Sequence, residues 1–135
     1  MAQKALKMEV VTPERTVFSD DVESVVVPAT QGYLGVLYNH APMITGLEIG
    51  VIKYTKDNKE NLMAVTGGFM EVMDNKLVVL ADAAELSSEI DVIRAQEAKK
   101  RAEQRIETKK EEIDFERAKL ALYRALNRIE AAEKD

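Results

Sequence analysis

Glycine and proline are confined to the first part of the chain, and this distribution is the feature that most constrains its fold. All six glycines and all three prolines lie at or before Gly68 in a chain of 135 residues. The residues from Glu89 to the end contain neither, so nothing in their composition interrupts a helix. We therefore divide the chain near Ser87 and Ser88 into a first module, residues 1–87, and a second module, residues 88–135.

Charge follows the same division. The first module carries 7 basic and 12 acidic side chains and so accounts for the whole net charge of -5. The second module carries 12 of each sign, including six of the seven arginines. An acidic chain of this kind is not expected to bind nucleic acid, because that requires a basic face.

Short apolar and β-branched runs, each ended by turn residues, fill the first module. Two runs within residues 50–65 predict one β-hairpin, and two runs within residues 69–80 predict another, with Asp74-Asn75 as its turn. The run at 22–27 is predicted to stop at Pro28. Strands this short and this closely spaced favour an antiparallel sandwich or barrel. The runs cover residues 6–11, 22–27, 50–55, 62–65, 69–73 and 77–80.

The second module is predicted to be helical throughout. Ser87 or Ser88 is the expected N-cap, with Glu89 and Asp91 in the first turn, where carboxylates favour the helix dipole. One uninterrupted helix would be about 70 Å long at 1.5 Å per residue. A helical hairpin is the economical alternative, with its break in the weakest stretch, residues 107–112. The sequence leaves both arrangements open.

Arginines gather on one face of each predicted helical segment, given a turn of about 100° per residue. The face of the first segment combines one acid with arginines and small alanines. The second segment has an arginine stripe opposite an apolar stripe. The first face holds Asp91, Arg94, Ala95, Ala98, Arg101, Ala102 and Arg105. The arginine stripe holds Arg117, Arg124 and Arg128, and the apolar stripe holds Phe115, Leu122, Leu126 and Ile129.

These arginine faces have two interpretations. The planar guanidinium binds phosphate or carboxylate through two parallel hydrogen bonds, so folding the segments together would create a site for a polyanion. The faces also fit an interaction helix that docks on an acidic partner, or a solvated surface with ordinary ion pairs such as Glu97 with Arg101.

Several functional classes are not expected. The chain has no cysteine and a single histidine, His40, so thiol catalysis and His- or Cys-based metal sites are excluded. Gly67-Gly68 does not form a phosphate loop and instead predicts a β-bulge or a close sheet contact. No nucleophile–base pair is visible, so we expect no enzyme. We also expect no membrane span and no signal peptide.

Three sequence strings together resemble the epsilon subunit of bacterial F-type ATP synthases. They are residues 32–42 (GYLGVLYNHAP), residues 65–72 (VTGGFMEV) and residues 90–95 (IDVIRA), and the likeness extends along essentially the whole chain. The last string matches the I/L-D-x-x-R-A motif of epsilon subunits that bind ATP. Tyr33 departs from the acidic residue of some relatives, and Tyr38-Asn39 replaces the commoner Pro-Gly before His40.

The resemblance implies a fold and a set of site residues. The fold is a ten-stranded N-terminal β-sandwich, residues 1–87, followed by a C-terminal two-helix hairpin, residues 88–135. The implied ATP site comprises Glu85, Ile90, Asp91, Arg94, Ala95, Arg101, Arg124 and Arg128. The implied contacts with the gamma subunit and the c-ring comprise Tyr33, Leu34, His40 and Pro42.

The same resemblance implies a function. The chain would be a rotor subunit of the central stalk in a proton-translocating synthase, peripheral to the cytoplasmic face of the bacterial membrane. ATP would act as a regulatory ligand that favours the folded hairpin, with the role of Mg²⁺ left open. The extended tail would contact the catalytic beta subunits and inhibit hydrolysis. The alternatives are a purely structural stalk coupler and a nucleotide sensor outside any synthase.

Overall fold

The structure is a computed structural model that describes residues 4–108 and 112–132, and side chains within 4–107 and 116–132. Eight strands precede a short 3-10 turn and two α-helices. The strands are β1 (Leu6–Val11), β2 (Thr16–Val22), β3 (Ser24–Ala29), β4 (Gly32–Leu37), β5 (Met43–Lys56), β6 (Lys59–Met73), β7 (Lys76–Ala81) and β8 (Ala84–Leu86). The helical elements are η1 (Ser87–Glu89), α1 (Val92–Thr108) and α2 (Glu112–Ala132).

Two hairpins with the same turn chemistry form the centre of the sheet. Asp57-Asn58 joins β5 to β6, and Asp74-Asn75 joins β6 to β7. All four turn residues have positive φ, at 52°, 61°, 51° and 59°, as a type I′ turn requires, and Asn and Asp tolerate this conformation. Both predicted hairpins are therefore confirmed.

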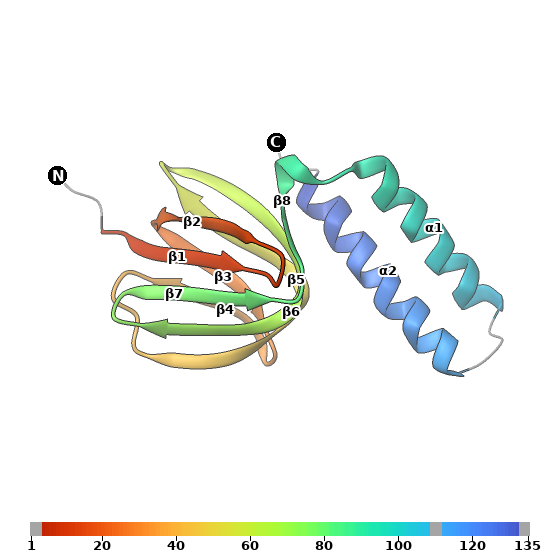
Figure 1. Cartoon of the computed structure of the whole chain (residues 1–135), viewed down its shortest axis with the longest axis horizontal. Helices are drawn as coiled ribbons and strands as arrows, with labels where there is room; N and C mark the ends of the chain where they lie inside the picture. The colour runs from red at the N-terminus through yellow and green to blue at the C-terminus, as the bar shows by residue number, and fades with distance from the viewer. Residues whose placement is uncertain (1–3, 109–111, 133–135) are drawn as a thin grey trace.

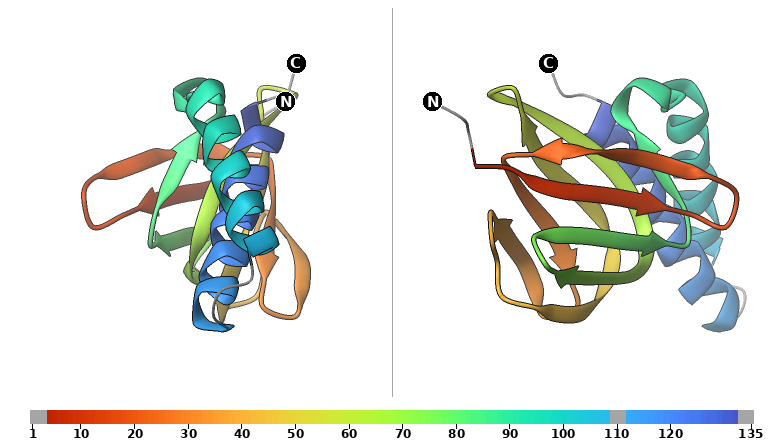
Figure 2. Two further views of the ribbon diagram at one scale, coloured as in Figure 1. Left: turned by 90° about the vertical axis from the view of Figure 1, so that its right-hand side faces the viewer. Right: turned by 60° about the vertical axis from the view of Figure 1, so that its left-hand side comes forward.

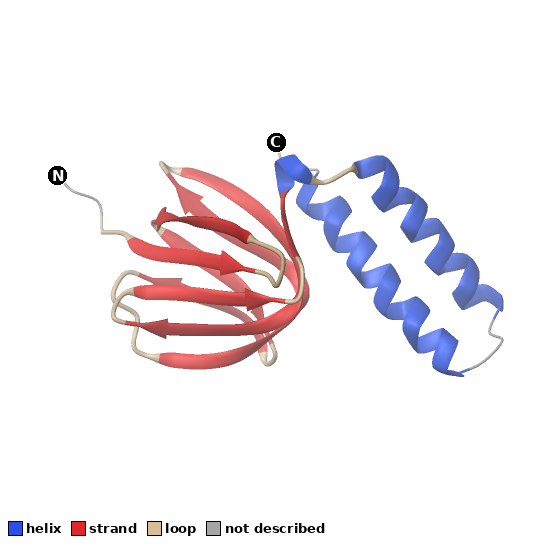
Figure 3. Ribbon diagram, in the orientation of Figure 1, coloured by secondary structure: helices blue, strands red, loops and turns tan. Residues whose placement is uncertain are grey.

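The sheet order is β2-β1-β7-β6-β5-β3-β4, with β8 added alongside β6. The sheet folds over on itself into a sandwich, and the helices lie at one end of it (Figure 1, Figure 3). Ten strands were implied, whereas the described residues form eight. The difference arises because β5 and β6, with 14 and 15 residues, each run through the fold as one long strand.

The close contact predicted at Gly67-Gly68 is present between β6 and β7. Gly68 has φ of +131°, and a Cβ there would lie 2.1 Å from the carbonyl oxygen of Leu80. Only glycine fits at this position, since any side chain would collide with the neighbouring backbone.

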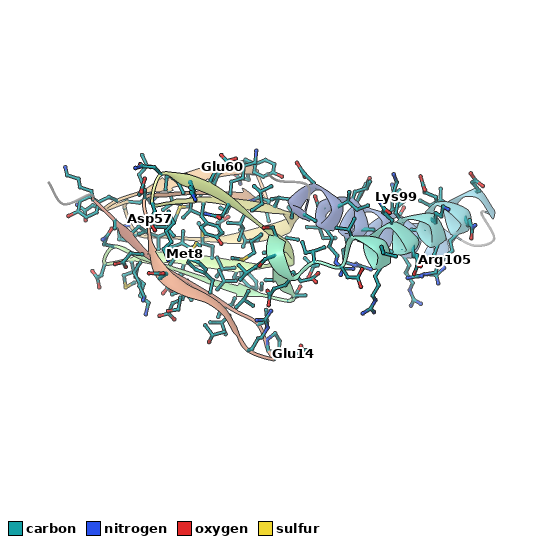
Figure 4. The ribbon with its side chains drawn as sticks, turned by 90° about the horizontal axis from the view of Figure 1, so that it is seen from above. Met8, Glu14, Asp57, Glu60, Lys99 and Arg105 are labelled. Atoms are coloured by element: carbon teal, nitrogen blue, oxygen red, sulfur yellow. The ribbon has the colours of Figure 1, made fainter. Side chains whose placement is uncertain are left out.

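The main core lies between the layers of the sandwich. Leu6, Met8 and Val10 alternate with partly exposed residues along β1 and are completely buried. Figure 4 shows the Met8 side chain within the sandwich. Alternation of this kind is the pattern of a strand with one face in the core.

One strand prediction was wrong. The run at 22–27 is divided at Glu23 between β2 and β3, and β3 continues through Pro28 to Ala29. The register between β3 and β5 shifts between Val26 and Ala29. Pro28 therefore falls outside the β5 ladder, where its missing N–H costs no hydrogen bond.

The predicted helix start was also wrong. Ser87 is not the N-cap of the long helix, because residues 87–89 form the turn η1 and α1 begins only at Val92. Asp91 caps α1 instead, since its Oδ1 accepts a hydrogen bond from the backbone N–H of Arg94 at 3.1 Å. The helices are separated within the predicted stretch 107–112, and they form an antiparallel hairpin (Figure 1).

Alanines form the seam between α1 and α2. Ala95, Ala102, Ala118 and Ala125 are buried, at two positions seven residues apart on each helix. Small side chains at this spacing let two helices approach closely. The apolar stripe predicted for α2 is therefore partly wrong: Leu126 is 40% exposed, and the side chain of Phe115 lies outside the described residues.

The hairpin is attached to the sandwich through α2, which lies between α1 and the sheet (Figure 1, Figure 2). A second, small apolar cluster forms at this contact, apart from the main core. It has five buried residues and shares none with the main core, so we expect the sandwich to be stable without the hairpin. The cluster consists of Val51, Leu62, Ala64, Ile90 and Ala131, with Ala132 at its margin.

Candidate functional site

The start of α1 brings three predicted site residues together. Asp91 is exposed, and one of its carboxylate oxygens accepts the hydrogen bond that caps the helix. That cap fixes the first turn of α1, on which Arg94 is exposed. Ile90, just before the cap, is anchored in the small apolar cluster between sheet and helix. The motif thus exposes the Arg94 guanidinium on the first turn of α1, which is held in place by the Asp91 cap and by the burial of Ile90.

Ala95 lies about 100° around the helix from Arg94 and is completely buried in the helix seam. Its role in the structure is close packing, since a larger side chain would push α1 away from α2. Of the predicted site residues, Ile90 and Ala95 therefore shape the site, and the charged residues around them supply its chemistry.

Glu85 and Arg128 form the direct link between β8 and α2. Arg128 Nη2 donates to Glu85 Oε2 at 3.2 Å, and Arg128 Nε lies 2.6 Å from Glu85 Oε1. Both side chains are largely buried, with 25% and 33% exposure. The Arg128 Nε is buried and makes no well-aligned hydrogen bond despite this proximity. The pair holds α2 on the sandwich.

Helix geometry puts both arginine rows on one edge of the hairpin. On each helix, the arginines lie about 90° from the buried alanines, in the same rotational sense. Because the helices are antiparallel, equal rotations from the seam lead to the same side. With Ala95 facing Ala125, Arg94 lies level with the turn that carries Arg124 and Arg128. We call this surface the arginine edge; it comprises Arg94, Arg101, Arg105, Arg117, Arg124 and Arg128.

The arginine edge has few counterions of its own. Within the described parts of both helices, no ion pair reaches Arg94, Arg101 or Arg124, and Arg128 pairs with Glu85. Cations at this spacing repel one another unless an anion lies between them. The arrangement suits a ligand with several negative charges. Figure 4 shows Arg105, on this edge, and Lys99 on opposite sides of the hairpin.

A further ion pair, between Arg15 and Glu89, was missed in the sequence. Arg15 Nη2 donates to both carboxylate oxygens of Glu89, at 3.0 and 2.9 Å, and Glu89 Oε1 also accepts from the Leu86 N–H at 3.1 Å. The hydrogen bond from Arg15 is the main reason that the pKa of Glu89 is lowered. Arg15 could have been singled out, because it is the only arginine of the first module.

The structure does not bring the four predicted interface residues together. His40 and Pro42 lie in the loop after β4, at the end of the sandwich away from the helices, whereas Tyr33 lies at the start of β4. A six-residue strand is about 20 Å long. Tyr33 is 63% exposed, but Leu34 packs against the main core.

Exposed apolar side chains of the sandwich extend well beyond these four positions. Phe69 and Leu80 face each other across β6 and β7 and line an open groove of about 430 Å³ with Pro13 and Asp82. The sequence indicates this exposed surface, because β6 and β7 carry large apolar residues on both faces and a single core covers only one face. The large, exposed apolar residues of the sandwich are Tyr33, Leu37, Tyr38, Ile44, Phe69, Met73 and Leu80.

Two absences hold for the described part of the chain. No three acidic or histidine side chains there gather in a way that would hold a metal ion. Neither helix is long and apolar enough, over its described residues, to cross a membrane.

Comparison with known proteins gives matches along nearly the whole chain. Residues 5–87 match the family model of the ATP synthase Delta/Epsilon chain β-sandwich domain, and residues 88–133 match that of its long α-helix domain. The ATP synthase epsilon chain of Syntrophomonas wolfei is 51% identical over 99% of this chain and 98% of its own. That of Symbiobacterium thermophilum is 52% identical over 94% and 92%.

Solved structures give the same fold. A chain in the cryo-EM structure of the Euglena gracilis mitochondrial ATP synthase superposes with a TM-score of 0.82, covering 97% of this chain and 82% of that chain. The identity is 19%, so this likeness concerns the fold alone. The expected β-sandwich followed by two helices and the resemblance to bacterial epsilon subunits are both confirmed.

Proposed function

Because the chain belongs to the delta/epsilon chain family of ATP synthase, we propose that it is a central-stalk rotor subunit that joins gamma to the c-ring and regulates ATP hydrolysis. Epsilon chains are non-catalytic subunits, so the expectation that this chain is not an enzyme is confirmed by its family. The proposal places it on the cytoplasmic face of a bacterial membrane, held there through a proton-translocating complex.

The exposed apolar side chains of the sandwich support the coupling role. Large apolar residues that cluster on a surface indicate protein contacts. Phe69 and Leu80 with their groove offer one docking surface, and the loop that holds His40 and Pro42 offers another at the end away from the helices. In the proposal, gamma and the c-ring cover these surfaces.

The observation that carries the regulatory role is the arginine edge. Arg94, Arg101 and Arg124 project from the folded hairpin without ion-pair partners among the described residues. Phosphate groups are the anions that guanidinium binds in two-point fashion. We therefore assign ATP as the regulatory ligand, with these three arginines and Arg128 around its phosphates.

The remaining predicted residues fit around such a ligand. Glu85 and Asp91 are acceptors at the end of the edge nearest the sandwich, where they suit an adenine amino group. Ile90 supplies an apolar contact there, and Ala95 keeps α1 close enough to α2 for both arginine rows to reach one ligand. No hydrolysis is assigned, since no phosphate loop is present.

The proposed regulation follows from the dependence of the arginine edge on the folded hairpin. A ligand that needs arginines from both helices binds the folded state and not the extended one, so it shifts the equilibrium toward folding. At one hundred times its dissociation constant, this effect amounts to about 2.7 kcal/mol. Without ATP, the helices extend toward the catalytic beta subunits and hinder hydrolysis.

One observation favours the purely structural coupler. Arg128 already has a protein carboxylate, Glu85, as its partner, so the arginines could serve only to pair with acidic protein surfaces. Titration calorimetry of the isolated chain with ATP, and with ADP as the comparison, separates the two functions. Saturable binding of ATP supports the switch, and no binding at millimolar ATP supports the coupler.

A further inference from the structure

The loop that holds His40 is fixed by a residue from another part of the chain. Asn75 Oδ1 accepts a hydrogen bond from the backbone N–H of Asn39 at 2.7 Å. The Asn75 Nδ2 donates to the carbonyl oxygen of Ala5 at 2.8 Å. The Asn75 carbonyl oxygen accepts from the Lys7 N–H at 3.2 Å. One side chain and its own backbone therefore tie the β4–β5 loop and the start of β1 to the β6–β7 turn.

This connection controls a loop that has little support of its own. Asn39 has a φ of 60°. Within the loop, the His40 N–H donates to the Leu37 carbonyl oxygen at 3.1 Å, and His40 Nδ1 lies 2.7 Å from the Ala41 carbonyl oxygen. Tyr38 stands out from the loop with 46% exposure, beneath the ammonium group of Lys4. We therefore expect the orientation of the loop to depend on the hydrogen bond between Asn75 and Asn39, its central residue.

The loop is surrounded by exposed apolar side chains. Ile44 is 71% exposed and Met73 is 50% exposed. The pairing of Met43 with Val72, extended by one residue, brings Pro42 opposite Met73. This end of the sandwich therefore presents an apolar rim around a hydrogen-bonded loop, which suits a protein partner rather than a small ligand.

We propose that Asn75 is a positioning residue for docking, which holds the Tyr38–Pro42 loop in the conformation that contacts the gamma subunit. The inference rests on the proposed coupling function. Asn75 itself need not touch gamma. A loop already fixed before binding loses less conformational entropy when the complex forms, so removing the clamp weakens binding without removing a contact.

The two Asp-Asn turns provide a matched test. Asn75→Gly keeps the positive φ and the turn type but removes both side-chain hydrogen bonds. Asn58→Gly makes the same change in the β5–β6 turn, where Asn58 has a φ of 61° and uses its backbone N–H, which glycine retains, to bond Glu23. Asn75→Asp keeps the acceptor for Asn39 and loses only the donor to Ala5.

The measurement is the affinity of each full-length variant for the F1 complex prepared without this chain. We expect Asn75→Gly to bind about three- to tenfold more weakly, because the released loop must be ordered when the complex forms. Asn58→Gly should bind like the parent, and Asn75→Asp should lie between them. Hydrogen exchange at the Asn39 amide should be faster in Asn75→Gly alone. Asn58→Gly should melt like the parent, whereas Asn75→Gly should melt a few degrees lower and remain fully folded at the temperature of the binding measurement.

Tyr38→Ala distinguishes the possible failures. If Tyr38→Ala weakens binding but Asn75→Gly binds like the parent, the loop docks without needing Asn75 and the inference is overturned. If neither change affects binding, this end of the sandwich does not contact F1, and both the proposed docking and the inference fail. Equal losses in Asn75→Gly and Asn58→Gly would also overturn it, because turn stability would then be the cause.

Discussion

Arg15 and Glu89, which are 74 residues apart in the chain, join the β1–β2 loop to the turn η1 at the point where the sandwich ends and the helices begin. Thr12 shapes the loop, because its hydroxyl accepts hydrogen bonds from the N–H groups of Glu14 and Arg15. Glu89 is held from both sides, by Arg15 and by the Leu86 N–H. The pair joins η1 to the sandwich, so we expect any movement of the helices to begin after Glu89.

The Arg15–Glu89 pair predicts a pH dependence. The pKa of Glu89 is lowered from 4.5, first by the hydrogen bond from Arg15 and then by that from Leu86. A carboxyl whose pKa is lower in the folded state stabilises the fold above its unfolded pKa, and this contribution disappears as the pH falls through the folded value. Glu89→Gln should therefore lower the melting temperature at pH 7, and its difference from the parent should shrink as the pH falls below 4.5.

Thermal denaturation of parent and variant across this range measures the effect. Glu48→Gln is the control, since Glu48 is exposed and no ion pair of the described residues involves it. A difference between Glu89→Gln and the parent that stays constant from pH 7 to pH 3 would contradict the assignment.

Removal of the helices tests the independence of the sandwich. The main core contains no residue beyond Leu86, so a chain that ends at Ser87 keeps all of it. We expect this fragment to show the β-sheet circular dichroism of the parent, to melt cooperatively and to retain gamma in a pull-down. It exposes Val51, Leu62 and Ala64, which α2 contacts in the full chain. An unfolded fragment, or one that fails to bind gamma, would refute the division into two modules.

The alanine seam predicts a sharp dependence on side-chain size. Ala125 is 2% exposed between the helices, so Ala125→Leu should force them apart at a cost of about 1–3 kcal/mol. Hydrogen exchange over residues 116–132 should accelerate, while the sandwich strands keep their protection. Leu126→Ala, at the neighbouring position with 40% exposure, is the control. Unchanged exchange in Ala125→Leu would mean that the seam does not hold the hairpin together.

The sequence predicted the elements whose signals are local. Both Asp-Asn hairpins follow from turn residues that tolerate positive φ, and the gathering of the arginines follows from helical periodicity. The helix cap was misassigned because Ser87, Ser88 and Asp91 are all good N-cap residues, and only the packing of Ile90 in the small cluster selects the last of them.

Long-range relationships were not predictable in the same way. Nothing local connects Arg15 with Glu89, or Asn75 with Asn39. The buried face of α2 was predicted from its largest apolar residues. The residues that are buried against α1 are alanines, because two helices in close contact leave room only for small side chains. The exposed apolar face of β6 and β7 also requires the strand order, since Phe69 and Leu80 become neighbours only across the sheet.

Arg94 provides the most direct test of the ATP site. Its guanidinium is exposed on the first turn of α1, level with Arg124 and Arg128 across the seam. Arg94→Ala should weaken ATP binding about ten- to hundredfold, because one charge-assisted hydrogen bond contributes about 1.5–3 kcal/mol. Combination with Asp91→Asn should abolish or greatly weaken binding, and since Asn caps helices as well as Asp does, α1 should remain intact.

Two further variants decide whether this loss reflects the geometry of the site. Arg94→Lys should restore binding only in part, since an ammonium group cannot make the two parallel bonds of a guanidinium. Lys99→Ala should bind ATP like the parent, because Lys99 and Arg105 project from opposite sides of the hairpin (Figure 4). Calorimetry in which the Asp91→Asn, Arg94→Ala double variant binds as tightly as the parent would rule out the arginine edge as the nucleotide site. Parent protein that binds no ATP at millimolar concentration would leave the arginines as a surface for acidic protein partners.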